Sequence, residues 1–68
     1  MSKEMTWKEL VEKAKELGYE YDDELEKITN QYYYFYKIGG EIYNVSFELI
    51  AKDRTPDQMY QIMLALEN

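Results

Sequence analysis

The sequence predicts an α+β fold in which two helices pack on one face of a small antiparallel sheet. Three observations lead to this fold class: an amphipathic helical pattern near each end of the chain and, between them, the stretch QYYYFYKIGGEIYNVSFEL at 31–49, whose side chains alternate around two glycines. Helical patterns at both ends and strand patterns between them are typical of layered α+β folds. We therefore expect a single domain that spans residues 1–68.

The first helix is predicted over residues 7–17. Thr6 and Glu9 have the spacing of a capping box, in which the threonine hydroxyl accepts from the amide of Glu9 and the glutamate carboxylate accepts from the amide of Thr6. The apolar side chains that follow recur with the helical period: Trp7, Leu10, Val11, Ala14 and Leu17. Gly18 stands where a left-handed C-terminal cap is favoured.

The segment YEYDDELEKITN at 19–30 allows two interpretations. Its tyrosines alternate as in a short strand, whereas its leucine and isoleucine have the spacing of one helical turn. We favour a short extended segment at 19–22, an acidic turn, and a strand that begins near Lys27. The alternative is a single helical turn capped by Asp22 or Asp23.

The central stretch predicts a β-hairpin. Gly39 and Gly40 are expected to form a two-residue loop, because glycine readily adopts the positive φ that such loops require. This loop fixes the register of the two strands. In that register, Tyr36 pairs with Tyr43.

Alternation with period two divides the hairpin side chains between two faces. The mostly apolar face, on which both helices are expected to pack, consists of Tyr32, Tyr34, Tyr36, Tyr43, Val45, Phe47 and Leu49. The opposite face carries Tyr33, Phe35 and Ile42 among polar residues. Because two strands make a narrow platform, either the segment 19–22 adds a third strand or a second copy of the chain completes the sheet.

A second helix is predicted to start at Thr55-Pro56-Asp57-Gln58. Threonine is a favourable N-cap, proline fits the first helical position, and glutamine completes the pattern of a capping box. The side chains expected to point inward are Met59, Ile62, Met63 and Leu66.

Composition narrows the possible functions. Fourteen acids against eight bases give a net charge of −6, which disfavours nucleic acid or anionic lipid as a direct partner and favours a basic protein. Without Cys and His, the chain can form neither a disulfide nor a typical zinc site. It also lacks the thiolate and imidazole that many enzymes use in catalysis. We therefore expect no enzyme activity, no cofactor and no metal site. No apolar run has the length of a membrane span, and no secretory signal is recognisable, so we expect a cytoplasmic protein.

One candidate partner-binding segment contains five acids within seven residues: Glu20, Asp22, Asp23, Glu24 and Glu26. Charge runs of this kind usually remain solvated. Alternatively, their carboxylates mimic a row of phosphates and occupy the basic groove of a nucleic-acid enzyme, because charge complementarity is what attracts such enzymes to DNA. In either case these acids would attract a basic partner.

The second candidate partner-binding site consists of Tyr33, Phe35 and Ile42. If no other element covers their face, it presents an aromatic patch in a mixed polar surround, as protein interfaces do. The alternative is that a further structural element, or the mate in a homodimer, covers Tyr33 and Phe35.

The segments MTWKELVEKAKELGY at 5–19 and DRTPDQMYQIMLALE at 53–67 resemble small uncharacterised acidic proteins of phages and mobile elements of Gram-positive bacteria. This resemblance implies an accessory role, such as inhibition of a host defence nuclease, and it implies no catalytic residues. We therefore predict a small acidic, non-enzymatic protein-binding module, which acts by surface occlusion or by nucleic-acid mimicry. The alternatives are a self-associating structural domain and a designed protein with no natural function.

Overall fold

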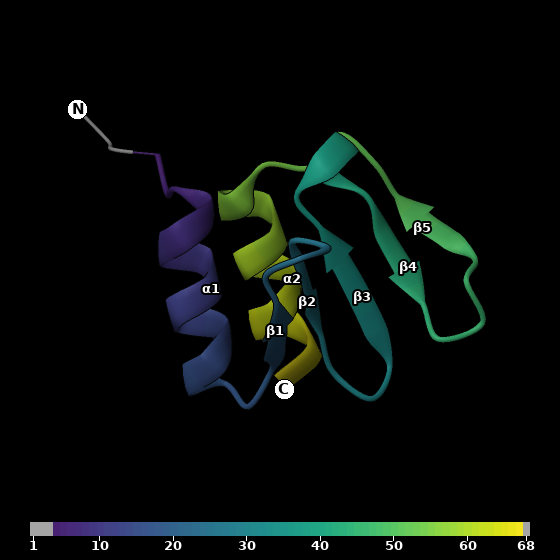
Figure 1. Ribbon diagram of the computed structural model, residues 1–68, viewed down its shortest axis with the longest axis horizontal. Coiled ribbons are helices and arrows are strands. Elements are labelled where there is room, and N and C mark those ends of the chain that lie inside the picture. Colours follow the sequence, from purple (N-terminus) through teal and green to yellow (C-terminus); the bar gives the residue numbers. More distant parts are fainter. Residues whose placement is uncertain (1–3, 68) are drawn as a thin grey trace.

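The computed structural model describes residues 4–67 and contains two helices and a five-stranded antiparallel sheet, which confirms the α+β class (Figure 1). The helices are α1 (Trp7–Glu16) and α2 (Pro56–Glu67). The strands are β1 (Glu20–Asp22), β2 (Lys27–Thr29), β3 (Tyr33–Tyr36), β4 (Ile42–Asn44) and β5 (Leu49–Ala51), with a short 3-10 turn η1 (Ile38–Gly40) between β3 and β4. The strands lie in the sheet in chain order. Neither described helix is long and apolar enough to cross a membrane.

The start of α1 confirms the predicted capping box. The Thr6 hydroxyl accepts from the amide of Glu9 at 3.1 Å, and the Glu9 carboxylate accepts from the amide of Thr6 at 2.9 Å. The helix ends at the C-cap Leu17, and Gly18 follows with φ +94°. The buried stripe of this helix consists of Leu10, Val11 and Ala14.

The start of α2 repeats the same chemistry. The Thr55 hydroxyl accepts from the amide of Gln58 at 3.2 Å, and the Gln58 side-chain oxygen accepts from the amide of Thr55 at 2.9 Å. Met59 and Met63 are buried as predicted, whereas Leu66, which was also expected to point inward, is exposed. The two helices contact each other and lie at the end of the molecule that holds β1 and β2, while β4 and β5 extend away from them (Figure 1).

The segment 19–30 forms strands, so the helical-turn alternative is wrong. β1 and β2 form a hairpin in which Tyr21 lies opposite Ile28. Asp22 Oδ1 accepts from the amides of Glu24 and Leu25 at 3.0 and 3.2 Å, which closes the turn. The Asp22 carboxylate, which the alternative prediction placed at the start of a helical turn, therefore closes a hairpin turn instead.

The predicted register of the β3–β4 hairpin is wrong by two residues. Tyr34, rather than Tyr36, lies opposite Tyr43. The Tyr36 amide donates to the carbonyl of Glu41 at 2.8 Å, so the loop is longer than the two glycines. The loop is held by a distant segment, because the carbonyl of Gly40 accepts from the amide of Arg54 at 3.0 Å.

Two asparagines divide what was predicted as two long strands. Asn30 Oδ1 accepts from the amides of Tyr32 and Tyr33 at 2.8 and 2.7 Å, which makes the turn between β2 and β3. Asn44 Oδ1 accepts from the amides of Ser46 and Glu48 at 2.9 and 3.0 Å, which makes the turn into β5. Asparagine favours such turns because its side chain bonds the backbone of the following residues.

The core lies between the helices and a row of side chains that crosses the whole sheet. This row consists of direct strand partners: Tyr21, Ile28, Phe35, Ile42 and Ala51. Its three central members are buried together with Tyr19 and with the inward side chains of both helices. Each of the five strands thus contributes at least one residue to the face that meets the helices.

The structure reverses the predicted assignment of the two sheet faces. Tyr32 and Phe47, which were expected in the core, are 59% and 69% exposed, and Tyr34 and Tyr36 are half-buried. A shift of two residues leaves every side chain on its own face, so the register error is not the cause. The cause is Ile28 in β2, which lies opposite Phe35 and adds apolar area to its face. When only β3 and β4 are considered, that face looks the more polar of the two.

Candidate functional site

The face of the sheet that points away from the helices, here called the outer face, has an acidic end and an aromatic end. Residues that are direct partners across antiparallel strands share a face. The longer outer row consists of Glu20, Thr29, Tyr34, Tyr43 and Leu49. The shorter row consists of Asp22, Lys27 and Tyr36. Both rows begin on an acid of β1 and lead to tyrosines of β3.

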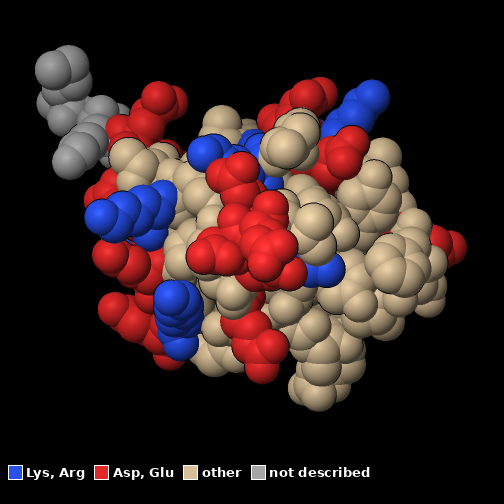
Figure 2. All heavy atoms as spheres, viewed as in Figure 1, with Lys and Arg blue, Asp and Glu red and all other residues tan. Residues whose placement is uncertain are grey.

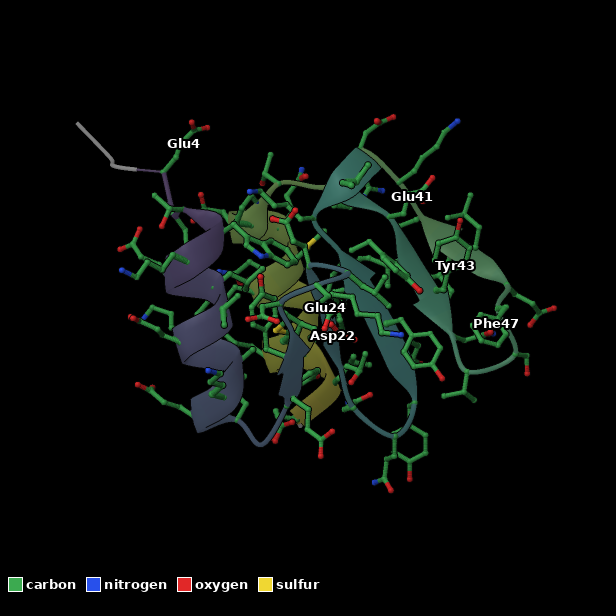
Figure 3. The ribbon with its side chains drawn as sticks, in the orientation of Figure 1. Glu4, Asp22, Glu24, Glu41, Tyr43 and Phe47 are labelled. Carbon is green, nitrogen blue, oxygen red and sulfur yellow. The ribbon has the colours of Figure 1, made fainter. Side chains whose placement is uncertain are left out.

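Four rings form the aromatic end, here called the aromatic cluster: Tyr34, Tyr36, Tyr43 and Phe47. The ring centroids of Tyr36 and Tyr43 lie 5.5 Å apart with the planes at 86°, and those of Tyr34 and Phe47 lie 5.5 Å apart at 42°. Tilted and edge-to-face pairs of this kind are favourable because of the ring quadrupoles. Phe47 belongs to the β4–β5 connection and reaches the cluster through a backbone with φ +62° (Figure 3).

Lys27 already places a cation on this cluster. Its Nζ lies 5.1 Å from the ring centroid of Tyr34 and 6.0 Å from that of Tyr36. Both distances are within the range of cation–π attraction. The tyrosines of β3 therefore present electron-rich faces to the outside of the sheet.

A shallow depression of about 210 Å³ opens at the far side of the cluster and is lined by Tyr36, Glu41, Tyr43 and Phe47. The Tyr43 hydroxyl donates to Glu41 Oε1 at 3.2 Å. Desolvation and this hydrogen bond to the Glu41 carboxylate raise the pKa of Tyr43 above its usual value, so at neutral pH the phenol keeps its proton and Glu41 is the acceptor. A carboxylate thus stands at the rim of a pocket with three aromatic walls.

The acids form the other end of the outer face. In Figure 2 the acidic side chains gather over β1 and its turn, and a broad uncharged area covers β3–β5 beside them. Glu20, Asp23 and Glu24 are exposed, whereas Asp22 is half-buried and its carboxylate closes the β1–β2 turn. Glu26 forms an ion pair with Lys37 at 3.1 Å. Of the five predicted acids, Glu20, Asp23 and Glu24 therefore neither close the turn nor form this ion pair.

The predicted aromatic anchor is wrong. Phe35 and Ile42 are buried under the helices, and Tyr33 is half-buried against the same core. Phe35 and Ile42 therefore cannot meet a partner while the protein is folded, and Tyr33 lies beside them on the face that the helices cover. The rings that the outer face does offer were assigned to the core by the sequence prediction.

One further hollow, of about 490 Å³, lies beyond the end of α1. Tyr19 contributes to its lining, and its buried hydroxyl has no hydrogen-bond partner among residues 4–67. Burial and, secondarily, the charge of Glu67 raise the pKa of Tyr19. Within the same described part of the chain, no group of three acidic side chains is placed to hold a metal ion.

Comparisons of the chain with protein-family models, with curated proteins and with solved structures found no match. A functional proposal for this protein therefore depends on the geometry of the outer face and on the charge of the chain.

Proposed function

We propose that this chain is a small non-enzymatic protein-binding module that docks a basic segment of another protein on the outer face of its sheet. The observation that carries the proposal is that exposed carboxylates and an aromatic cluster share the sheet face that points away from both helices, with only strand β2 between them. Aromatic side chains dominate the energetic centres of interfaces, and surrounding charges steer the encounter. The net charge of −6 favours a basic partner.

A protein partner fits this face better than a nucleic acid does. Bases can stack on exposed rings, but that mode also needs basic neighbours for the phosphates. Lys27 is engaged by two tyrosines, and Lys37 is paired with Glu26. The carboxylates at the other end of the face would repel a phosphate backbone.

Occlusion of a basic protein surface also fits better than mimicry of a phosphate row. A phosphate mimic requires an extended array of acids, whereas here each outer row holds a single acid, at its β1 end, and continues through Thr29 or Lys27 to a tyrosine of β3. An apolar and basic protein surface satisfies both ends of the face at once. An inhibitor of the phage accessory type that covers such a surface is one form of this proposal, and it depends on the sequence resemblance.

The proposal is tested by selecting ligands for the protein from a random peptide library. The selected peptides are expected to combine Lys or Arg with apolar residues and to bind more weakly as salt rises. Reversal of three exposed acids, Glu20→Lys, Asp23→Lys and Glu24→Lys, is expected to lower the affinity at low salt by at least about tenfold, which corresponds to ~1.4 kcal/mol. Fluorescence anisotropy of a labelled peptide measures the change.

The matched control reverses three exposed acids on the α1 side of the molecule: Glu4→Lys, Glu12→Lys and Glu16→Lys. The two triple variants have the same net charge, so a larger loss in the β1 variant locates the site. Equal losses in both variants, or selected peptides without basic residues, would contradict the proposal. Asp22 is left intact because its carboxylate holds the turn.

Self-association through β5 is a second candidate. β5 is an edge strand whose only partner in the described sheet is β4, and Leu49 and Ile50 are about half exposed. An apolar edge strand invites pairing with a second copy. A two-fold axis would then join two sheets into one continuous sheet.

Sedimentation equilibrium at micromolar concentrations tests this second candidate. If β5 pairs with its own copy, the wild-type chain is expected to form dimers, and Ile50→Lys, which adds a charge to the edge, is expected to be a monomer. A wild-type chain that stays monomeric throughout removes the second candidate and leaves the first unaffected.

A further inference from the structure

We infer that the depression lined by Tyr36, Glu41, Tyr43 and Phe47 binds the ammonium group of a lysine side chain of the docked basic segment. The inference rests on the proposed function, because the lysine belongs to the basic segment that docks on the outer face. It adds one defined pocket and one ligand group to a surface that is otherwise described only by its charge and its rings.

The two tyrosines provide the aromatic part of this pocket. Their planes stand at 86° with the centroids 5.5 Å apart, and the corner of such a T is flanked by a face of each ring. Ring faces attract cations, and sites for alkylammonium groups are commonly built from rings set at an angle to each other. Phe47, from the connection after β4, closes a third side.

Glu41 provides the negative charge. It neighbours Tyr36 across the end of the hairpin, where the Tyr36 amide donates to its carbonyl. Its side chain lies over Gly39, where an added Cβ would come within 3.3 Å of Glu41 Cγ. The glycine therefore leaves room for the carboxylate, which the Tyr43 hydroxyl holds at the rim of the depression.

The state of the Glu41 carboxylate favours lysine over arginine. Oε1 already accepts from the Tyr43 hydroxyl at 3.2 Å. A guanidinium pairs best when both carboxylate oxygens accept from its planar fork, whereas a compact ammonium needs only one oxygen. Lys27 shows that the same sheet face accommodates an ammonium group over its tyrosines.

Lys27 does not occupy the inferred pocket. It is the partner of Tyr36 on the β2 side, whereas Glu41 lies on the β4 side of the same strand. Two strand spacings, about 10 Å, separate these positions. That separation is close to the Debye length at physiological salt, so repulsion between the two cations is weak.

The test is an NMR titration of the labelled protein with Nα-acetyl-lysine methylamide, whose side-chain ammonium group is free. This titration needs no partner protein. The ring signals of Tyr36, Tyr43 and Phe47 are expected to shift and to saturate, with a dissociation constant in the millimolar range. The neutral isostere N-acetyl-norleucine methylamide is expected to bind at least about fivefold more weakly, as is the arginine counterpart. Glu41→Gln and Phe47→Leu are each expected to weaken lysine binding by about fivefold.

Tyr32→Leu is the matched control, because Tyr32 is an exposed ring of the neighbouring turn that does not line the depression. This variant is expected to bind the lysine compound like the wild type. Backbone amide spectra verify that each variant is folded. Equal binding of the lysine and norleucine compounds, or shifts centred away from the three rings, would overturn the inference.

The outcomes separate the inference from the proposed function. If selected basic peptides bind and respond to the β1 reversals but bind Glu41→Gln as well as wild type, the pocket inference fails and the docking proposal stands. If the lysine compound binds in the pocket but no basic peptide is selected, the pocket stands and the docking proposal fails.

Discussion

Phe35→Ala is expected to leave most of the protein unfolded at room temperature, while Phe47→Ala has little effect on folding. The Phe35 side chain is fully buried (0% exposed) in the central strand of the sheet, and its ring meets that of Tyr19 edge-on at 6.0 Å. Truncation of a buried phenylalanine costs about 3–5 kcal/mol, which is comparable to the whole stability that a core of this size supplies. Phe47 is 69% exposed, so its truncation is expected to cost less than about 1 kcal/mol.

Urea unfolding followed by the fluorescence of Trp7 measures both variants. Trp7 is the single tryptophan, and its indole N–H donates to the Tyr21 hydroxyl at 3.2 Å, so its emission reports on the contact between α1 and β1. Because the two substitutions remove the same ring from opposite faces of the sheet, their comparison tests the face assignment directly. A stable Phe35→Ala together with an unfolded Phe47→Ala would place the core on the other face.

The starts of both helices could be predicted because their chemistry is local. At Thr6 and Glu9, and again at Thr55 and Gln58, donor and acceptor lie three residues apart, so the capping bonds need no information from the rest of the chain. The turn at Asp22 is equally local, but the same carboxylate could also have capped a helical turn, so the sequence left both interpretations of this segment open. Short-range hydrogen bonds thus fix where these elements begin.

The choice between the sheet faces could not be made from the hairpin alone. Alternation shows which side chains share a face, but the helices select the face by the apolar area that all strands present together. The decisive residues are Tyr21 and Ile28, which pair into one row with Phe35 and Ile42. Their constant spacing of seven residues is a signal that a meander of short strands leaves in the sequence.

The candidate site could be predicted only where a residue type by itself decides whether a side chain is buried or exposed. The acids of β1 and its turn were identified because charge runs rarely enter a core. The aromatic cluster was missed because a tyrosine is compatible with either face, since its ring is apolar and its hydroxyl tolerates water. Glu41 was missed because its place in the candidate site depends on a contact with Tyr43, and only the correct register brings this contact about.

Gly40→Ala is expected to destabilise the protein by about 3 kcal/mol. A Cβ at this position would press against the carbonyl oxygen of Arg54 and come within 2.6 Å of its backbone nitrogen. Backbone atoms cannot rotate away as a side chain can, so the two segments must separate. That separation would break the hydrogen bond from the Arg54 amide to the Gly40 carbonyl and would strain the adjacent bond from Asp53 to Gly39.

Gly18→Ala is the matched control for this prediction. Gly18 also has positive φ, at +94°, but a Cβ there meets nothing within 4 Å. Its substitution is therefore expected to cost only the conformational strain, about 1–2 kcal/mol. The difference between the two free energies of unfolding, measured in urea, isolates the contact between the η1 turn and the segment that enters α2. Equal losses would mean that this contact contributes nothing, and that the longer loop and its shifted register have another cause.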